Sequence, residues 1–496
     1  MPDRKAAPSP GPMVAAAPTG SPAVSLAAPA RRFAPASPNG VLAIVLAGIC
    51  LANLDLFIVN VALPDIAASF GGVSLGDLSW VLNGYAIAYA ALLVFFGRLA
   101  ERHRRDWSFL CGVALFTLAS AACGAAGSLT GLVLFRIVQA AGAALMTPSS
   151  LGLLLAVFPP ARRSAAVRTW AAIGGFAAAL GPLLGGLLVP VSWRLIFWVN
   201  LPLGLLAILA GALKLPRIPG HDAPRPPLSA ALLVTLGIAA LVLAIVKVND
   251  WGWESPGVGA CVLIAAICIG LFCLHCARHA NPFIEPALFR IRPFTGATLI
   301  MAPYSIAFGG LVLSVVLWEQ TAWHWSAMQA GFTITPGPFM VPVTSLLLSA
   351  RLQRRIGPVG VVSLGIISFM ASFAIFALAL GPAPDAGMVV LGMLLSGVGV
   401  VLTFPTLMGI GTSALPASSL STGSAIINMT RQAAIAIGVA ILVAIVGLAA
   451  TPEARLAAFR AAWWTMAAIT ALGFLPLAMF IRPASERGTI TASSTS

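Results

Sequence analysis

Long apolar runs separated by short polar loops recur along most of this chain. A helix needs about 20 mostly apolar residues to cross the hydrocarbon core of a bilayer. The runs predict fourteen membrane-spanning helices, and therefore an all-α integral membrane protein. The expected spans are 41–63, 78–97, 107–127, 131–157, 167–190, 195–213, 228–247, 257–277, 295–318, 327–349, 358–380, 386–410, 422–449 and 460–481. The weakest division is 411–421, which is small and polar but carries no charge.

The two ends of the chain lack this pattern. Residues 1–39 are rich in Pro, Ala and Ser, so they bury too little apolar surface to fold, and we expect a disordered tail. Residues 483–496 are expected to form a second, short tail. No cleavable signal peptide stands out, because the first long apolar run begins near Val41 and is long enough to span.

Composition agrees with a lipid environment. Hydrophobic residues make up 59% of the chain, charged residues only 8%, and the mean hydropathy is +0.99. A soluble protein of this size needs more charge to cover its surface. The net charge of +14 does not indicate nucleic acid, because Arg and Lys lie in short clusters between apolar runs. We therefore expect the lipid bilayer as a partner, and no nucleic acid.

The placement of basic residues predicts an orientation. With a cytoplasmic N-terminus, 22 of the 28 Arg and Lys residues fall on the cytoplasmic side, as the positive-inside rule requires. The exceptions are Arg194, Lys247, Arg455 and Arg460, outside, and Arg136 and Arg431, within helices. The chain is thus predicted to be a multi-pass protein of the cytoplasmic (inner) membrane with both termini in the cytoplasm.

A faint internal repeat adds a domain organisation. Residues 98–102 (RLAER) and 351–355 (RLQRR) both follow expected helices on the cytoplasmic side. Related loops in two six-helix halves are the sequence trace of a repeat-built transporter, and the positions match if the seventh and eighth helices are an insertion. The predicted parts are a tail at 1–39, a bundle at 40–215, two inserted helices at 216–280, a second bundle at 281–482 and a tail at 483–496.

Asp55 is the most informative residue, because it lies well inside the first expected helix. A carboxylate at the centre of a membrane helix costs about 2.5–3.5 kcal/mol on insertion scales, so it normally faces a cavity or a partner. Burial raises the pKa of a carboxyl group and a nearby cation lowers it, which suits a group that binds and releases a proton. The alternative is a structural Asp fixed to an Arg.

Arg136 and Gln139 lie one turn apart in the fourth expected helix, on one face. A fixed cation at that depth needs a carboxylate, carbonyl groups or water, so this face is either a cavity wall or a structural clamp. In the fifth helix, Gly174, Ala178, Pro182 and Gly186 recur at a spacing of four and make a smooth stripe for close helix contact. Pro182 should kink that helix, which favours a bending or gating role.

Two further groups are candidates. Glu319 and Gln320 at the outer end of the ninth helix are either interfacial or cavity-lining. Cysteines and histidines gather at the end of the eighth helix, where a metal site is the alternative to small apolar Cys and interfacial His, and we expect no metal. These residues are Cys273, His275, Cys276 and His279. The seven cysteines imply no disulfide framework, since most lie in apolar segments.

Five ordered motifs resemble the major facilitator superfamily and, within it, the 14-spanner drug/proton antiporters of the EmrB/QacA type. Residues 54–64 (LDLFIVNVALP) are similar to that group's first helix, and Arg136 with Gln139 to its fourth-helix motif. Gly181 and Pro182 with Gly185 and Gly186 resemble its antiporter motif. Residues 193–204 (WRLIFWVNLPLG) and 428–432 (NMTRQ) resemble its sixth and thirteenth helices. The resemblance covers roughly residues 41–480.

The resemblance implies a major facilitator fold: two six-helix bundles with two inserted helices, working by proton-driven alternating access. It implies that Asp55 is a proton-coupling site and Arg136 its electrostatic neighbour. The cytoplasmic gate would comprise Gly97, Arg98, Glu101 and Arg102. The substrate-cavity candidates are Asn60, Gln139, Glu319, Gln320, Asn428 and Arg431. The gate departs from the family pattern, because Arg104 replaces a turn glycine that the second half keeps as Gly357.

The function expected is export of lipophilic drugs or antibiotics by a proton-coupled antiporter, with no cofactor and the proton gradient as energy source. The alternatives are a narrow exporter of an endogenous metabolite, or an importer of the same fold. An enzyme is not expected, because all five histidines lie at helix ends or in loops. The partners expected are a small lipophilic substrate and, where the cell has an outer membrane, a membrane-fusion adaptor; we expect a monomer.

Overall fold

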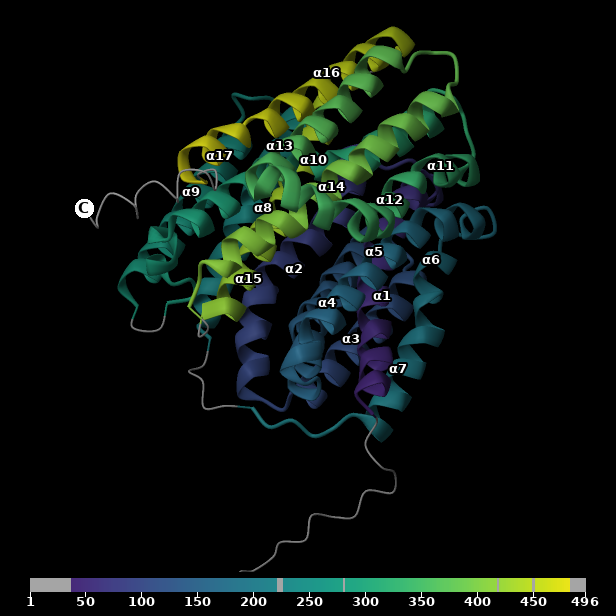
Figure 1. Ribbon diagram of the computed structural model, residues 1–496. Coiled ribbons are helices and arrows are strands. Elements are labelled where there is room, and N and C mark those ends of the chain that lie inside the picture. The colour runs from purple at the N-terminus through teal and green to yellow at the C-terminus, as the bar shows by residue number, and fades with distance from the viewer. Residues whose placement is uncertain (1–36, 221–225, 280–281, 417–418, 448–450, 482–496) are drawn as a thin grey trace, which may run out of the picture. The chain divides into compact units, whose positions relative to one another are not determined.

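The computed structural model describes residues 37–220, 226–279, 282–416, 419–447 and 451–481, and every regular element in these ranges is a helix (Figure 1). The long helices are α1 (Pro38–Ser69), α2 (Leu75–Arg102), α3 (Arg105–Gly124), α4 (Leu129–Val157), α5 (Pro160–Leu188), α7 (Asn200–Lys214), α8 (Leu228–Trp251), α9 (Pro256–Arg278), α10 (Arg292–Thr321), α13 (Ala350–Ala379), α14 (Ala386–Ser413), α15 (Leu420–Val446) and α16 (Pro452–Ala471). The short ones are α6 (Leu195–Trp198), α11 (Ala327–Ile334), α12 (Pro336–Thr344), α17 (Phe474–Phe480), a 3₁₀ helix η1 (Pro286–Arg290) and a π-helix η2 (Ser345–Ser349). The expected tails 1–39 and 483–496 lie largely outside the described residues.

Thirteen helical segments in the described ranges are long and apolar enough to cross a membrane. The expected fourteenth, at 327–349, is also helical, but it is divided into α11, α12 and the π-helix η2. Pro336 opens α12 and Pro342 lies inside it, and each proline removes a backbone donor from the helix. The predicted all-α fold with about fourteen spans is therefore confirmed, and the tenth span is segmented rather than missing.

Hydrogen bonds between helix ends define two faces of the bundle. On the first, which we call the basic face, Arg105 donates to Ile218 O and Gly152 O at 3.1 and 3.0 Å, and Arg98 Nη1 donates to Pro282 O at 2.9 Å. On the opposite face, Arg455 Nη1 donates to Thr321 O at 2.8 Å. Consecutive long helices thus run alternately between the two faces, as the loop pattern predicts.

We call the helices before the predicted insertion (α1 to α7) the first half and those after it (α10 to α17) the second half; helices pack both within each half and between the halves. In the first half α1 packs on α5, and α4 packs on α2 and α3; in the second half α13 packs on α14, and α10 packs on α15. The halves meet where α2 packs on α15 and where α5 packs on α11 and α12. The two helices of the predicted insertion lie at the side of this junction: α8 packs on α2 and α15, and α9 packs on α8 (Figure 1).

Candidate functional site

A buried ion pair links α1 and α4 in the first half. Asp55 and Arg136 are both 0% exposed, and Arg136 Nη1 donates to Asp55 Oδ2. Gln139 lies one turn along α4 on the same face, and its Nε2 donates to Asp55 Oδ1 at 2.8 Å. Asn200, at the start of α7, donates to the same oxygen at 3.2 Å. Three N–H groups therefore hold a carboxylate in the acceptor-only form that ionised Asp takes.

A second set of contacts fixes the groups around this pair. Ser120 of α3 accepts hydrogen bonds from Gln139 and Asn200 at 3.2 and 3.0 Å and donates to Phe197 O at 2.8 Å. Arg136 Nε donates to Val81 O at 3.2 Å, and its guanidinium lies 4.2 Å from the ring centroid of Tyr85. Such an arrangement pre-organises the charges, because a rotation of either group breaks several bonds.

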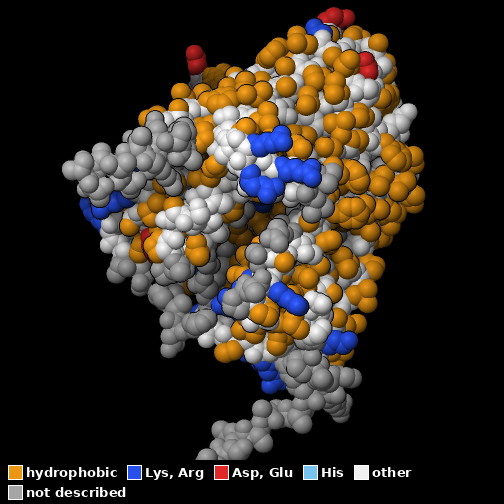
Figure 2. All heavy atoms as spheres, viewed as in Figure 1, with side chains coloured by type: hydrophobic (Ala, Val, Ile, Leu, Met, Phe, Trp, Pro, Cys, Tyr) orange, Lys and Arg blue, Asp and Glu red, His pale blue; other side chains and the backbone are white. Residues whose placement is uncertain are grey.

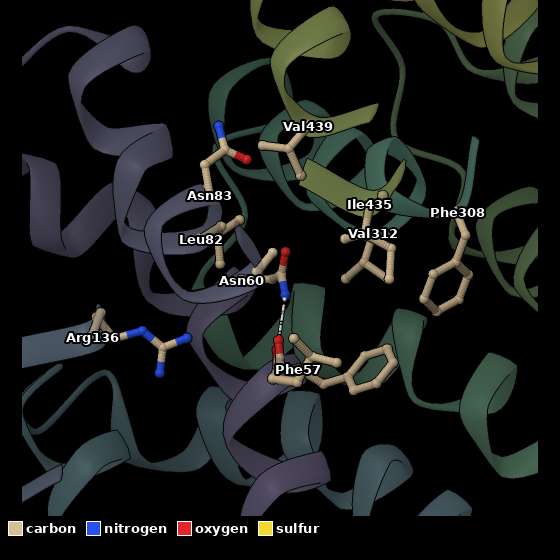
Figure 3. A pocket seen from close by; sticks show the side chains of 12 residues that line it. Phe57, Asn60, Leu82, Asn83, Arg136, Phe308, Val312, Ile435 and Val439 are labelled. Atoms are coloured by element: carbon tan, nitrogen blue, oxygen red, sulfur yellow. Dashed lines mark hydrogen bonds between the residues drawn. The ribbon is translucent and has the colours of Figure 1, made fainter. Parts of the chain in front are cut away.

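A small cavity lies between the halves beside this pair, with a volume of about 40 Å³ (Figure 3). Its lining residues come from both halves: Leu56, Phe57, Asn60, Leu82, Asn83, Ala86 and Arg136, and Phe308, Gly309, Val312, Ile435 and Val439. A drug-sized ligand needs about 300–1,000 Å³, whereas this space suits only a few waters. The space beside Arg136 is thus too small for such a ligand in this conformation.

The glycine motif of α5 brings the two halves into close contact. A Cβ at Gly181 would lie 2.8 Å from the Cβ of Phe57 on α1, and one at Gly185 would lie 3.2 Å from Ile58 O. A Cβ at Gly186 would lie 2.9 Å from the Cα of Met328 on α11, in the other half. Pro182 lies inside α5 between these contacts. The motif residues therefore act as contact points between helices, near the opposite face.

The gate candidates lie at the basic face. Gly97, Arg98 and Arg102 belong to the last turns of α2, while the side chain of Glu101 lies outside the described ones. Arg104 has φ −60°, so the replaced turn glycine causes no strain there, whereas Gly357 keeps φ +69°. Arg104 Nη2 instead donates to Asp106 at 2.6 Å, and this bond raises the pKa of the Arg104 guanidinium. The two related loops thus differ in backbone conformation.

The remaining cavity candidates lie apart from one another. Glu319 is 0% exposed and accepts a hydrogen bond from Thr333 Oγ1 at 2.6 Å, so it is more deeply buried than its place at a helix end suggests. Gln320 Nε2 donates to Val61 O across the halves at 3.1 Å. Asn428 donates back to Ser424 O, and Arg431 lies over the ring of Phe404. Of the six candidates, only Asn60 lines the central cavity.

Sequence reasoning did not single out three members of the site: Ser120, Tyr85 and Asn200. Asn200 carried a usable signal, because it is an amide within the apolar segment 193–204. Ser120 and Tyr85 gave no comparable signal, since one small hydroxyl or one phenol is common in such helices. Around His275 and His279, whose rings stack at 4.5 Å, the described residues include no group of three His, Cys, Asp or Glu placed to hold a metal.

Relatives of this chain carry names of exporters. It is 34% identical to the tetracenomycin C resistance and export protein of Streptomyces glaucescens over 66% of this chain, a match that spans 61% of that protein's length. It is 33% identical to the multidrug resistance protein Stp of Mycobacterium tuberculosis, covering 82% of this chain and 76% of the relative.

Fold and family comparisons agree with each other. A crystal structure of the peptide transporter POT in complex with sulfate superposes with a TM-score of 0.66 over 88% of this chain and 94% of that one, at 16% identity, which indicates a shared fold. The family model described as Major Facilitator Superfamily matches residues 45–439. The chain therefore belongs to the Major Facilitator Superfamily and is a membrane transporter rather than an enzyme.

Proposed function

We propose that this protein is a proton-coupled antiporter that exports lipophilic small molecules by alternating access. The names of its relatives support the direction and the cargo class: one is a resistance and export protein, and another is a multidrug resistance protein. The observation that carries proton coupling is the buried Asp55–Arg136 pair beside the cavity at the junction of the halves. A carboxylate at that depth is energetically costly and is usually functional, and reversible protonation is a function that uses it.

In this proposal a proton and the Arg136 guanidinium compete for the Asp55 carboxylate. A proton that binds Asp55 Oδ2 removes the negative charge, so the hydrogen bond from Arg136 Nη1 loses its ionic part. The guanidinium, which already lines the cavity, then faces water or cargo there. Loss of the proton restores the ion pair and the conformation described here.

Alternating access would use the contacts of α5. In the described conformation the halves touch near the opposite face, where Gly186 meets Met328 and Gln320 donates to Val61 O. Opening this side would break both contacts and admit water toward Asp55. Closure of the basic face would accompany it, with Gly97, Arg98, Glu101 and Arg102 in the gate.

The proposal includes an orientation and partners. The basic face and both termini lie in the cytoplasm of a cell whose cytoplasmic (inner) membrane holds the protein, because most Arg and Lys residues lie on that side. The protein works as a monomer, with a membrane-fusion adaptor where an outer membrane exists, and uses no cofactor. Fusions of a reporter active only in the periplasm to residues 103 and 252 test the orientation: only the second should be active.

Proteoliposomes test the transport. We expect a pH gradient, more acidic on the opposite-face side, to drive at least one of fluorescein, rhodamine 123 and Nile red uphill toward that side. Nigericin, which dissipates the pH gradient, should abolish the accumulation. Transport that is unaffected by nigericin would contradict proton coupling, and no transport of any dye would contradict broad export.

A second candidate is a narrow exporter of one metabolite. It is favoured by the tetracenomycin C relative, whose name refers to a single compound. A susceptibility panel on expressing and non-expressing cells separates the two candidates. Protection against several unrelated compounds indicates broad export, and protection against one compound indicates the narrow exporter.

A further inference from the structure

Arg431, on α15, is a cation at the junction of the halves whose charge no described carboxylate balances. Its Nε is buried and has no hydrogen-bond partner among the described residues. The ion pairs of the described chain do not include it. Its neighbours include the ring of Phe404, whose centroid lies 5.6 Å from the guanidinium carbon, and Tyr89, which interacts with it electrostatically. The residue is half-buried, and a cation within a membrane span is costly unless something offsets it.

Arg431 lies next to the central cavity. It precedes Ile435, which lines that cavity, by one turn of α15, so both side chains share one face of the helix. Tyr89 likewise follows the cavity residue Ala86 by one turn of α2. Because α15 begins at the basic face, Arg431 borders the cavity on the side toward that face. Movement of the halves about this junction would bring the guanidinium into an enlarged cavity.

The other charges at the cavity form an ion pair, and Glu319 lies about two helical turns beyond the cavity residue Val312 on α10. Asp55 and Arg136 neutralise each other. Asp55 also accepts hydrogen bonds from Gln139 and Asn200, and Arg136 also donates to Gln139 and Val81, while its Nη2 has no partner among the described residues. Glu319 lies in the last turn of α10, toward the opposite face, with Thr333 as its donor. Within the described residues, the formal charge left at the cavity is therefore the single positive charge of Arg431.

An aromatic cluster adjoins the guanidinium. Phe404 contacts Tyr304 and Phe308 at ring-centroid distances of 5.2 and 5.4 Å, and Phe308 contacts Phe57 across the halves at 6.1 Å. Such rings offer a flat apolar surface to the body of a lipophilic molecule. A cation beside an apolar surface can bind an amphiphilic anion, with the cation contacting the negative group and the rings contacting the apolar body.

The basic face of the second half also carries a positive surface pocket. A surface pocket of about 350 Å³ is lined by Leu348, Arg351, Leu352 and Arg355, and both arginines are exposed. Figure 2 shows a hollow in this view of the molecule with Lys and Arg side chains gathered above and below it. A field of this sign attracts anions and repels cations before they reach the cavity.

We infer that the exported compound is a lipophilic anion, a carboxylate, sulfonate or ionised phenol on an apolar ring system, and that Arg431 binds its negative group. The inference rests on the proposed transport function and names its substrate class. A charge-assisted hydrogen bond from a guanidinium to such a group is strong enough for about tenfold selectivity or more.

Fluorescein and rhodamine 123 test this inference, because they share a xanthene ring but are anionic and cationic at pH 7.5. In proteoliposomes, wild-type protein should transport fluorescein in preference to rhodamine 123. Arg431→Gln should reduce fluorescein transport about tenfold or more and change rhodamine 123 transport less than twofold. Arg431→Lys should retain an intermediate rate, because it keeps the charge but not the planar fork. Arg460→Gln, which removes an exposed charge from α16, is the matched control and should behave as wild type.

The outcomes separate this inference from the proposed function. Proton-driven transport of rhodamine 123 without fluorescein, or full fluorescein transport by Arg431→Gln, overturns the anion site and leaves the exporter in place. Transport of no compound overturns both. If Arg431→Gln fails to fold, thermal unfolding of wild-type protein decides: fluorescein should raise the melting temperature more than rhodamine 123 does, and the reverse order overturns the inference.

Discussion

The two halves of this transporter hold the ionisable side chains of their spans in opposite ways. In the first half, Asp55 and Arg136 form an ion pair in which both carboxylate oxygens accept hydrogen bonds. In the second half, Glu319 and Arg431 lie on different helices and have no described partner of opposite charge. Paired charges fix a geometry, whereas unpaired ones remain free to respond to an ion, a proton or a cargo molecule. The first half thus holds an ion pair that a proton could break, and the second half holds ionisable groups that a ligand could still bind.

Asp55→Asn should have the largest effect, because it leaves Arg136 buried without its counter-charge. We expect loss of proton-driven transport and a destabilisation of about 3–5 kcal/mol, the usual cost of removing one partner of a buried pair. Dye accumulation in proteoliposomes and thermal unfolding in detergent measure the two effects. Asp65→Asn, at an exposed position on the same helix, is the control and should change neither.

The double variant Asp55→Asn with Arg136→Gln sharpens this result. Removing both charges should destabilise the protein less than the sum of the single changes, because no uncompensated charge remains. Simple additivity would show that the two groups do not form a coupled pair. Uphill transport by Asp55→Asn at the wild-type rate would remove Asp55 from the coupling mechanism.

Gly181→Val should have the next largest effect, since it pushes α5 away from α1, the helix that carries Asp55. The added Cβ would lie 2.8 Å from the Cβ of Phe57 on α1, whose neighbouring turn carries Asp55. We expect about 1–3 kcal/mol of destabilisation together with a loss of transport. Gly270→Val on α9 is the matched control, because no atom of another helix lies within 4 Å of its Cβ position. Equal effects of both changes would show that the close contact of α5 with α1 is unimportant.

Glu319→Gln should behave unlike Asp55→Asn. The carboxyl group of Glu319 has no cation nearby in the described chain, and its Oε2 lacks a hydrogen bond. Burial without a cation favours the uncharged carboxyl group, so replacement by a neutral amide of the same shape should keep stability within about 1 kcal/mol of wild type. Thermal unfolding at pH 7.5 measures this. A loss as large as that of Asp55→Asn would indicate that Glu319 has a counter-charge in the folded protein.

Hydropathy was sufficient to predict the helices, because a span needs its apolar length whatever its neighbours are. The division near 411–421 also matches, as α14 ends at Ser413 and α15 begins at Leu420. The segmented tenth span was not predicted, since a window average does not register Pro336 or Pro342. The family resemblance implied that Arg136 is the electrostatic neighbour of Asp55. The residues alone offered an ion pair of Asp55 with an Arg only as one alternative, because sequence spacing does not say which helices touch.

Burial in the second half was harder to predict. Glu319 lies two residues from the end of α10, where sequence reasoning left an interfacial position open, yet the folding of α11 back onto α10 covers it completely. That packing depends on contacts made later in the chain, so no local pattern reports it. The role of Ser120 was equally unpredictable from the local sequence, because it depends on hydrogen bonds from Gln139 and Asn200 on other helices.

Arg431→Gln should have the smallest effect on stability, in contrast to Arg136→Gln. Removal of Arg136 leaves Asp55 as a buried, unpaired anion, whereas removal of Arg431 leaves no described carboxylate behind. We therefore expect a loss of about 3–5 kcal/mol for Arg136→Gln and less than about 1 kcal/mol for Arg431→Gln, the latter from lost contact with Phe404. Thermal unfolding of the two variants in one detergent measures the difference directly. Comparable losses would mean that Arg431 does have a counter-charge, and the contrast between the halves would then fail at the residue on which it most depends.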